Sequence, residues 1–120
     1  MRVIVLLFFA LSSFAQNNNQ RLAYQYYLDG DYEKAIVLYE EINKKNFYLN
    51  TYNPYFNSLI FSNKLSQAEK IAKKQFSKNN TRLNFLADII IAQFKLNKKK
   101  QYLFNLKKLH RLINKRNSQT

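Results

Sequence analysis

Three segments of this chain resemble one another at intervals of 33 and 34 residues, and this recurrence restricts the fold more than any other feature. Each segment centres on Gly30, Asn63 or Asn97. Glycine and asparagine are the residues that most readily adopt a left-handed backbone, which ends one helix and turns the chain toward the next. Self-similarity at such a period is the signature of repeat architectures. We therefore expect three hairpins that each turn at one of these residues.

Apolar residues recur at helical spacing on both sides of each expected turn, and no segment alternates as a strand would. The helices before the turns contain Leu22, Ala23, Tyr26 and Tyr27, then Tyr55, Phe56, Leu59 and Ile60, then Leu86, Ile89, Ile90 and Phe94. The helices after the turns contain Tyr32, Ala35, Ile36, Tyr39 and Ile42, then Leu65, Ala68, Ile71, Ala72 and Phe76, then Tyr102, Leu103, Leu106, Leu109 and Ile113. The pattern predicts an all-α chain of six helices.

Start signals locate several of these helices. Proline is tolerated in the first turn of a helix, so Pro54 predicts that the third helix begins within a few residues of it, at Asn53-Pro54 or at Thr51. Ser66 and Glu69 have the spacing of a capping box for the fourth helix, unless that helix already includes Leu65. Thr81 is the expected start of the fifth helix.

The stretch from Gly30 to Ile36, followed by Tyr39, resembles the tetratricopeptide repeat (TPR) family. The resemblance weakens along the chain, because the second segment keeps only part of the pattern and the third keeps mainly the spacing. It implies three stacked helix-turn-helix hairpins that form a short right-handed TPR-like α-solenoid. The expected repeat domain covers residues 16–116, with repeats at about 18–49, 50–80 and 81–115, and a disordered tail at 117–120.

The resemblance also implies a binding surface. Proteins of this family use the first helix of each hairpin to line a concave groove that receives a peptide or a partner protein. The matching polar positions here are Tyr24, Tyr27, Asn50, Asn53, Asn57, Asn84 and Lys95. Asparagine amides donate to and accept from a peptide backbone, and tyrosine combines apolar area with a polar tip. Ile60, Ile91 and Phe94 occupy the same row, but we expect them to be core residues.

The first 15 residues have the pattern of a secretory signal peptide. Arg2 provides a positive start, an apolar run of about 12 residues follows, and small residues at Ser13 and Ala15 flank a cleavage point. An uncleaved anchor is the alternative, although a spanning helix needs about 20 apolar residues. The ending Phe14-Ala15-Gln16 resembles signals of Gram-negative bacteria, so we expect an exported protein, periplasmic or secreted.

Positive charge is concentrated in the second half of the chain. Residues 16–61 hold four cations and five anions, a net charge of −1, whereas residues 62–120 hold fifteen cations and two anions, a net charge of +13. The basic face of the last helix comprises Lys98, Lys99, Lys100, Lys107, Lys108, Arg111 and Lys115, interleaved with leucines. This pattern suits a solvated terminal helix, an anionic membrane surface or an acidic partner. Its wide apolar stripe also leaves area for a further repeat.

Binding to protein is the expected function, and peripheral membrane association through the basic helix is the alternative. An RNA-binding basic domain would require the chain to stay in the cytoplasm, and arginine, which nucleic-acid sites favour, supplies only five of the twenty cations. The oligomeric state is left open.

Catalysis has little basis in this sequence. The chain has no cysteine and a single histidine, His110, which helical spacing places beside Leu106 and Ile113. Gly30 is the single glycine, so a glycine-rich phosphate loop is absent from the sequence. We therefore expect no enzyme activity, no metal site, no cofactor and no small-molecule substrate.

Overall fold

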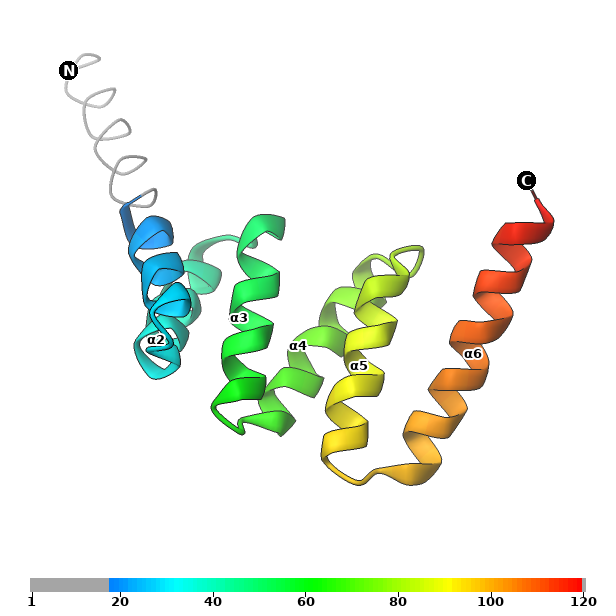
Figure 1. Cartoon of the computed structure of the whole chain (residues 1–120). Helices are drawn as coiled ribbons and strands as arrows, with labels where there is room; N and C mark the ends of the chain where they lie inside the picture. Colours follow the sequence, from blue (N-terminus) through cyan, green and yellow to red (C-terminus); the bar gives the residue numbers. More distant parts are fainter. Residues whose placement is uncertain (1–17, 120) are drawn as a thin grey trace, which may run out of the picture. The chain divides into compact units, whose positions relative to one another are not determined.

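The computed structural model describes residues 18–119, which contain six helices and no strand (Figure 1). The first helix runs from residue 18 to residue 28 of this described part. The others are α2 (Tyr32–Lys45), α3 (Leu49–Phe61), α4 (Leu65–Lys78), α5 (Leu83–Lys95) and α6 (Lys99–Ser118). The predicted all-α class is confirmed, and the packing of helical hairpins is consistent with a solenoid-like fold. The predicted signal segment lies outside the described residues.

The three predicted corner residues all have a left-handed backbone. The φ angle is 78° at Gly30, 58° at Asn63 and 60° at Asn97. Glycine has no Cβ to clash in this conformation, and asparagine tolerates it better than most residues. Sequence and backbone geometry therefore agree at each expected turn.

Two hydrogen bonds close the first corner. The N–H of Gly30 donates to the carbonyl oxygen of Tyr27 at 3.2 Å, and the N–H of Asp31 donates to that of Tyr26 at 2.8 Å. This pair of bonds is the Schellman motif, which satisfies carbonyl groups that the helix end leaves free. The third corner repeats both bonds around Asn97, at 3.1 and 2.9 Å.

The residue after each corner starts the next helix in the same way. Asp31, Lys64 and Lys98 are the N-caps of α2, α4 and α6, with φ of −87°, −89° and −83°. Their carbonyl oxygens each accept a hydrogen bond from the N–H four residues later, at 3.1, 3.1 and 3.0 Å. A backbone hydrogen bond to the N-cap carbonyl therefore begins each of these helices, and the N-cap side chain makes no capping hydrogen bond.

The chain divides into two compact units, one ending at Ser62 and the other beginning at Asn63, and each is described by itself. In the first unit α2 packs against α3. The buried residues of α2 lie on one helical face and comprise Ala35, Ile36, Tyr39 and Ile42. The rings of Tyr39 and Tyr55 are 6.0 Å apart, so aromatic contact joins the two helices.

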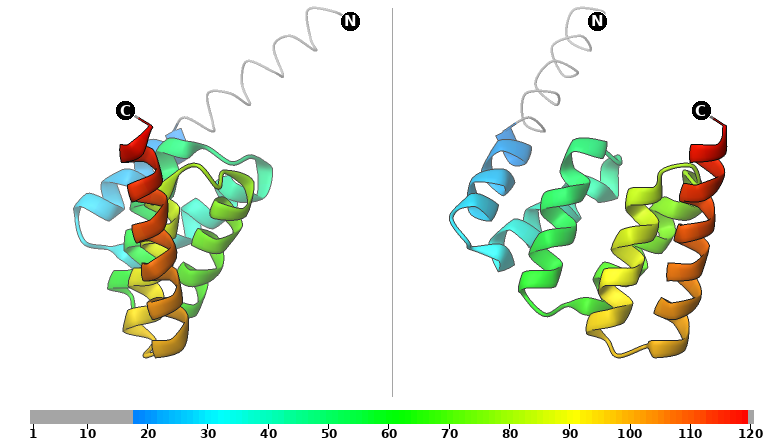
Figure 2. Two further views of the ribbon diagram at one scale, coloured as in Figure 1. Left: turned by 90° about the vertical axis from the view of Figure 1, so that its right-hand side faces the viewer. Right: turned by 45° about the vertical axis from the view of Figure 1, so that its right-hand side comes forward.

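In the second unit α5 packs against both α4 and α6, and the right-hand view of Figure 2 shows α6 beside α5. Ala68 and Ala72 are buried on α4, while Phe85, Leu86 and Ile89 are buried on α5. The 20-residue helix α6 contains no fully buried residue. Its main packing partner is α5.

The third helix starts earlier than either predicted start, two residues before Thr51 and five before Pro54. α3 begins at Leu49, and Pro54 lies inside it. Proline lacks an N–H, so the carbonyl of Asn50 loses its intrahelical donor, but Asn50 is exposed and water can replace that donor. The Pro54 carbonyl in turn accepts a hydrogen bond of 2.6 Å from the Ser58 hydroxyl.

Other helix ends also differ from expectation. Lys64 is the N-cap of α4, so Ser66 lies within that helix and the predicted capping box is wrong. α5 begins at Leu83 after the N-cap Arg82, one residue beyond the expected Thr81. α6 continues to Ser118, two residues into the segment that we expected to be a disordered tail.

Candidate functional site

A recess in the first unit is the candidate binding site. Its volume is about 620 Å³, and its walls come from the first helix, α2 and the start of α3. The lining residues are Asn18, Gln20, Arg21, Tyr24, Tyr39, Asn50 and Thr51. Two of the predicted groove residues, Tyr24 and Asn50, are therefore brought together from different helices.

The walls of this recess offer hydrogen-bonding groups of several kinds. Amide groups of Asn18, Gln20 and Asn50 can each donate and accept, and Arg21 supplies a positive charge. Burial raises the pKa of the Tyr39 hydroxyl well above its ordinary value, and the nearby Tyr24 and Tyr27 act in the same direction. Tyr39 therefore remains protonated at physiological pH and can still donate a hydrogen bond.

Two further predicted residues, Tyr27 and Asn57, contact each other beside this recess. The Asn57 side-chain amide donates to the Tyr27 hydroxyl at 3.2 Å, and the rings of Tyr24 and Tyr27 are 6.0 Å apart. Asn53 is exposed on α3, and its spacing from Asn50 and Asn57 places all three on one helical face. The predicted residues of the first unit therefore occupy one neighbourhood.

The predicted residues of the second unit do not form a comparable cluster. Asn84 and Lys95 are both exposed on α5, but they lie in its first and last turns, about 16 Å apart along the helix. Ile91 and Phe94 were expected to be core and are 43% and 63% exposed, so that prediction is wrong. The Phe94 ring packs edge-on against Tyr102 of α6 at 5.4 Å, which leaves its other side open.

The predicted basic face divides into exposed and engaged residues. Lys99, Lys100, Lys107, Arg111 and Lys115 are exposed on α6. Lys108 lies over the Phe76 ring, with its Nζ atom 5.0 Å from the ring centroid. Lys98 differs from the rest, because its Nζ atom pairs with Glu69 at 2.7 Å and it caps α6 rather than contributing to an open face.

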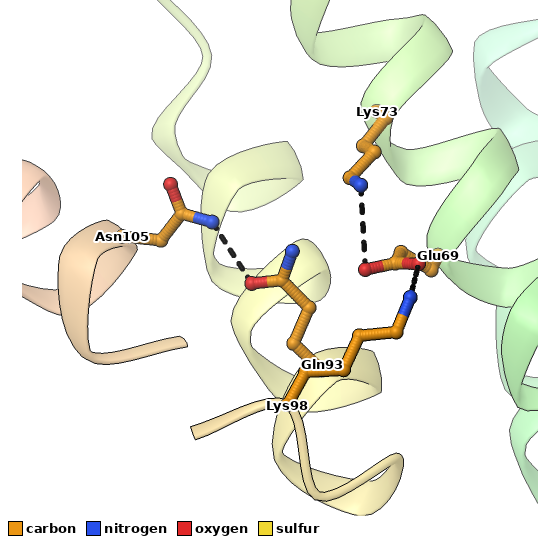
Figure 3. A network of polar contacts seen from close by, with 5 residues as sticks. All are labelled: Glu69, Lys73, Gln93, Lys98 and Asn105. Carbon is orange, nitrogen blue, oxygen red and sulfur yellow. Dashed lines mark hydrogen bonds and ion pairs between the residues drawn. The ribbon is translucent and has the colours of Figure 1, made fainter. Parts of the chain in front are cut away.

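A polar network joins the three helices of the second unit (Figure 3). Glu69 on α4 is buried, with Lys98 Nζ 2.7 Å from its Oε1 atom and Lys73 Nζ 3.4 Å from its Oε2 atom. Gln93 on α5 accepts a hydrogen bond of 2.9 Å from the Asn105 side chain on α6. The network therefore stabilises the unit from the inside.

The charge state of Glu69 follows from this environment. Burial alone would raise its pKa, but hydrogen bonds from Lys98 and Gln93 and the charges of Lys73 and Lys98 outweigh burial and lower the pKa. Glu69 is therefore ionised at neutral pH. This role was not predicted, although the sequence contains a signal for it. Glu69 is one of two acidic residues in the segment 62–120, which holds fifteen cations, and it occupies the position where the first repeat has Ile36.

Asn18, Gln20, Arg21 and Thr51 line the recess but were not among the predicted groove residues, and two of them were within reach of prediction. Arg21 lies one helical turn before Tyr24, and Thr51 follows Asn50 directly, so each is a neighbour of a predicted residue. Helical spacing from Tyr24 would have identified Arg21. Thr51 is nearly buried and its hydroxyl donates to the Tyr48 carbonyl at 2.7 Å, a contact that spacing alone does not reveal.

Several other features bear on function. His110 is exposed and its Nε2 atom lies 3.1 Å from the Asn114 amide nitrogen. Within residues 18–119, no three His, Asp or Glu side chains gather as a metal site would require. In the same residues, no helix is both long and apolar enough to cross a bilayer.

Comparison of the chain with known protein families, curated proteins and solved structures found no match.

Proposed function

We propose that this chain is a protein-binding module whose site is the recess of the first unit, extended along the row of Asn50, Asn53 and Asn57. The observation that carries this proposal is the convergence of Tyr24 and Asn50 on one recess, with polar groups from three helices. A volume of about 620 Å³ accommodates several side chains of a bound segment. The proposed ligand is therefore an extended peptide segment of a partner protein.

The chemistry of the recess supports a peptide ligand. A peptide backbone presents alternating N–H and C=O groups, and the amides of Asn18 and Asn50 complement both. The exposed Tyr24 ring adds apolar contact at low cost in side-chain entropy. Arg21 favours a peptide that carries a carboxylate near this point. We further propose that the TPR-like module acts after export, as the first 15 residues suggest.

Selection from a peptide library tests the proposal. The full chain is immobilised, bound peptides are identified, and their dissociation constants are measured by calorimetry. We expect Tyr24→Ala and Asn50→Ala each to raise the dissociation constant about tenfold, since each removes one contact in the recess. Asn46→Ala is the matched control, because it removes an exposed amide outside the recess. Selected peptides that bind all four proteins equally would place the site elsewhere.

A further inference from the structure

The second helix of each hairpin has two equivalent positions whose exposure can be compared between the repeats. They lie six and nine residues after the corner residue. In α2 these are Ile36 and Tyr39, each 1% exposed, and α3 packs against this helix. In α4 they are Glu69 and Ala72, 6% and 0% exposed, and α5 packs against it. Both pairs are covered within their own unit.

The corresponding positions of α6 are open. They are Leu103 and Leu106, which are 42% and 43% exposed. Ile113, also 42% exposed, and the exposed His110 continue the same line at spacings of three and four residues. We name these four residues the α6 stripe. The stripe has the apolar side chains of a helix-packing surface, and no helix of the described residues follows α6.

Charge indicates which kind of helix would fit this surface. α6 contains seven lysine and arginine residues and no acidic residue. Lys99 and Lys107 each lie one turn from Leu103, and Lys100 and Arg111 are exposed on the adjoining sector of the helix. Acidic side chains that flank an apolar face would meet opposite charge here, whereas a second copy of α6 would bring like charges together.

We propose that the α6 stripe binds an amphipathic, acidic helix of a partner protein. This helix takes the place on α6 that α3 takes on α2 and α5 takes on α4. It needs about three turns to cover the line from Leu103 to Ile113. Its apolar residues pack on Leu103, Leu106 and Ile113, and its carboxylates pair with the neighbouring cations. This surface is separate from the recess of the first unit.

A synthetic peptide tests the proposal on the full chain. The probe is a helical peptide of about 18 residues, long enough for partial helicity, with leucines on one face and glutamates beside them. Its affinity is measured by fluorescence anisotropy. We expect Leu106→Asp to raise the dissociation constant at least about tenfold, because it places a charge in the apolar contact and repels the glutamates.

Phe104→Asp is the matched control. It introduces the same charge and removes an even more exposed apolar side chain, but helical geometry places Phe104 on a different side of α6. We expect less than about a threefold change for this variant, since no packing is lost. A second probe with lysine in place of glutamate should not bind. Tyr24→Ala should leave the affinity for the acidic peptide unchanged, which separates this site from the recess.

Four results would overturn the proposal. In the first, the acidic peptide fails to bind. In the second, Leu106→Asp and Phe104→Asp lower the affinity for the peptide equally, which indicates non-specific charge attraction. Vesicles of phosphatidylglycerol bind the chain through Leu106 while the peptide does not, which assigns the face to a membrane. Light scattering detects a dimer that Leu106→Asp dissociates, which assigns the face to a second copy. Circular dichroism of each variant verifies that the helices remain intact.

Discussion

The two units share their backbone corners but differ in what fills the interior beside them. Six residues after its corner, the first unit places the apolar Ile36, and the second unit places the ionised Glu69. The other buried residues of α2 are Ala35, Tyr39 and Ile42, whereas Glu69 forms ion pairs with Lys98 and Lys73. The corner geometry depends on a few local residues. The buried position beside the corner can hold either an apolar or an ionised side chain while the backbone of the corner stays the same.

This difference gives the units opposite responses to pH. Burial raises the pKa of Tyr39 and Tyr55 in the first unit, so alkali is the condition that destabilises it. In the second unit the pKa of Glu69 is lowered, so acid is the condition that weakens its network. Five sets of substitutions test this difference between the units.

Ile36→Ala and Leu103→Ala remove the same kind of apolar bulk at equivalent repeat positions. Ile36 is buried, so we expect its truncation to lower the free energy of unfolding by about 2–5 kcal/mol. Leu103 is 42% exposed in α6, so its truncation should lower it by less than about 1 kcal/mol. Urea denaturation followed by circular dichroism measures both. Equal losses would show that α6 is covered as fully as α2.

Tyr55→Phe tests the alkaline response of the first unit. Burial raises the pKa of Tyr55 to about 12 in the fold, with a smaller contribution from Glu40, against an ordinary value of 10.0. The neutral hydroxyl is favoured in the folded chain, so this stabilisation is complete below pH 10 and is lost toward pH 12. A shift of this size corresponds to about 3 kcal/mol of unfolding free energy. We expect Tyr55→Phe to reduce the loss between pH 10 and 12, as measured by urea denaturation. A loss identical to that of the parent chain would contradict the assignment.

Glu69→Gln tests the acid response of the second unit. The substitution removes the charge that Lys98 and Lys73 neutralise, so we expect a loss of about 1–3 kcal/mol at pH 7. Because the folded pKa lies below the ordinary 4.5, the stabilisation is present above pH 4.5 and disappears as the pH falls through the folded value. The difference between the parent chain and the variant should therefore shrink in acid.

Lys98→Met and Lys73→Met act as a matched pair for the same network. Lys98 is the closer and less exposed partner, so its removal should be the more destabilising of the two. Thermal unfolding at neutral pH ranks them. The reverse order would mean that the ion pair of Glu69 with Lys73 contributes more to stability than the ion pair with Lys98.

Gly30→Ala and Gly30→Asn test the left-handed backbone of the first corner. No atom lies within 4 Å of a Cβ added at Gly30, so the cost of substitution comes from its φ of 78°. Alanine in a left-handed conformation should cost about 1 kcal/mol, and asparagine, which the other two corners use, should cost less. Thermal unfolding measures the two variants, and a larger loss with asparagine would point to a steric cause instead.

Features governed by local physics were predictable from the sequence. The corners at Gly30, Asn63 and Asn97 were predicted because few residue types adopt their backbone conformation. The core face of α2 followed from helical spacing of apolar residues. Tyr24 and Asn50, which lie together in the recess, were predicted from the resemblance to the tetratricopeptide repeat family.

Features that depend on several partners were not predictable. Pro54 was assigned to a first turn because the sequence does not show that water reaches the carbonyl it leaves without a donor. Glu69 was taken for a capping residue because Lys98 and Gln93 lie more than 20 residues away along the chain. Ile91 and Phe94 were taken for core because their exposure depends on how much of α5 its neighbours cover.

The order of helix contacts has a consequence for how fast the chain folds. α2 contacts α3, α4 contacts α5 and α5 contacts α6, and each of these pairs is adjacent in sequence. Closing such short loops loses little chain entropy before the contacts form, and proteins dominated by near-neighbour contacts reach the native state in microseconds to milliseconds. A chain of this kind leaves its apolar surfaces unprotected only briefly after it unfolds.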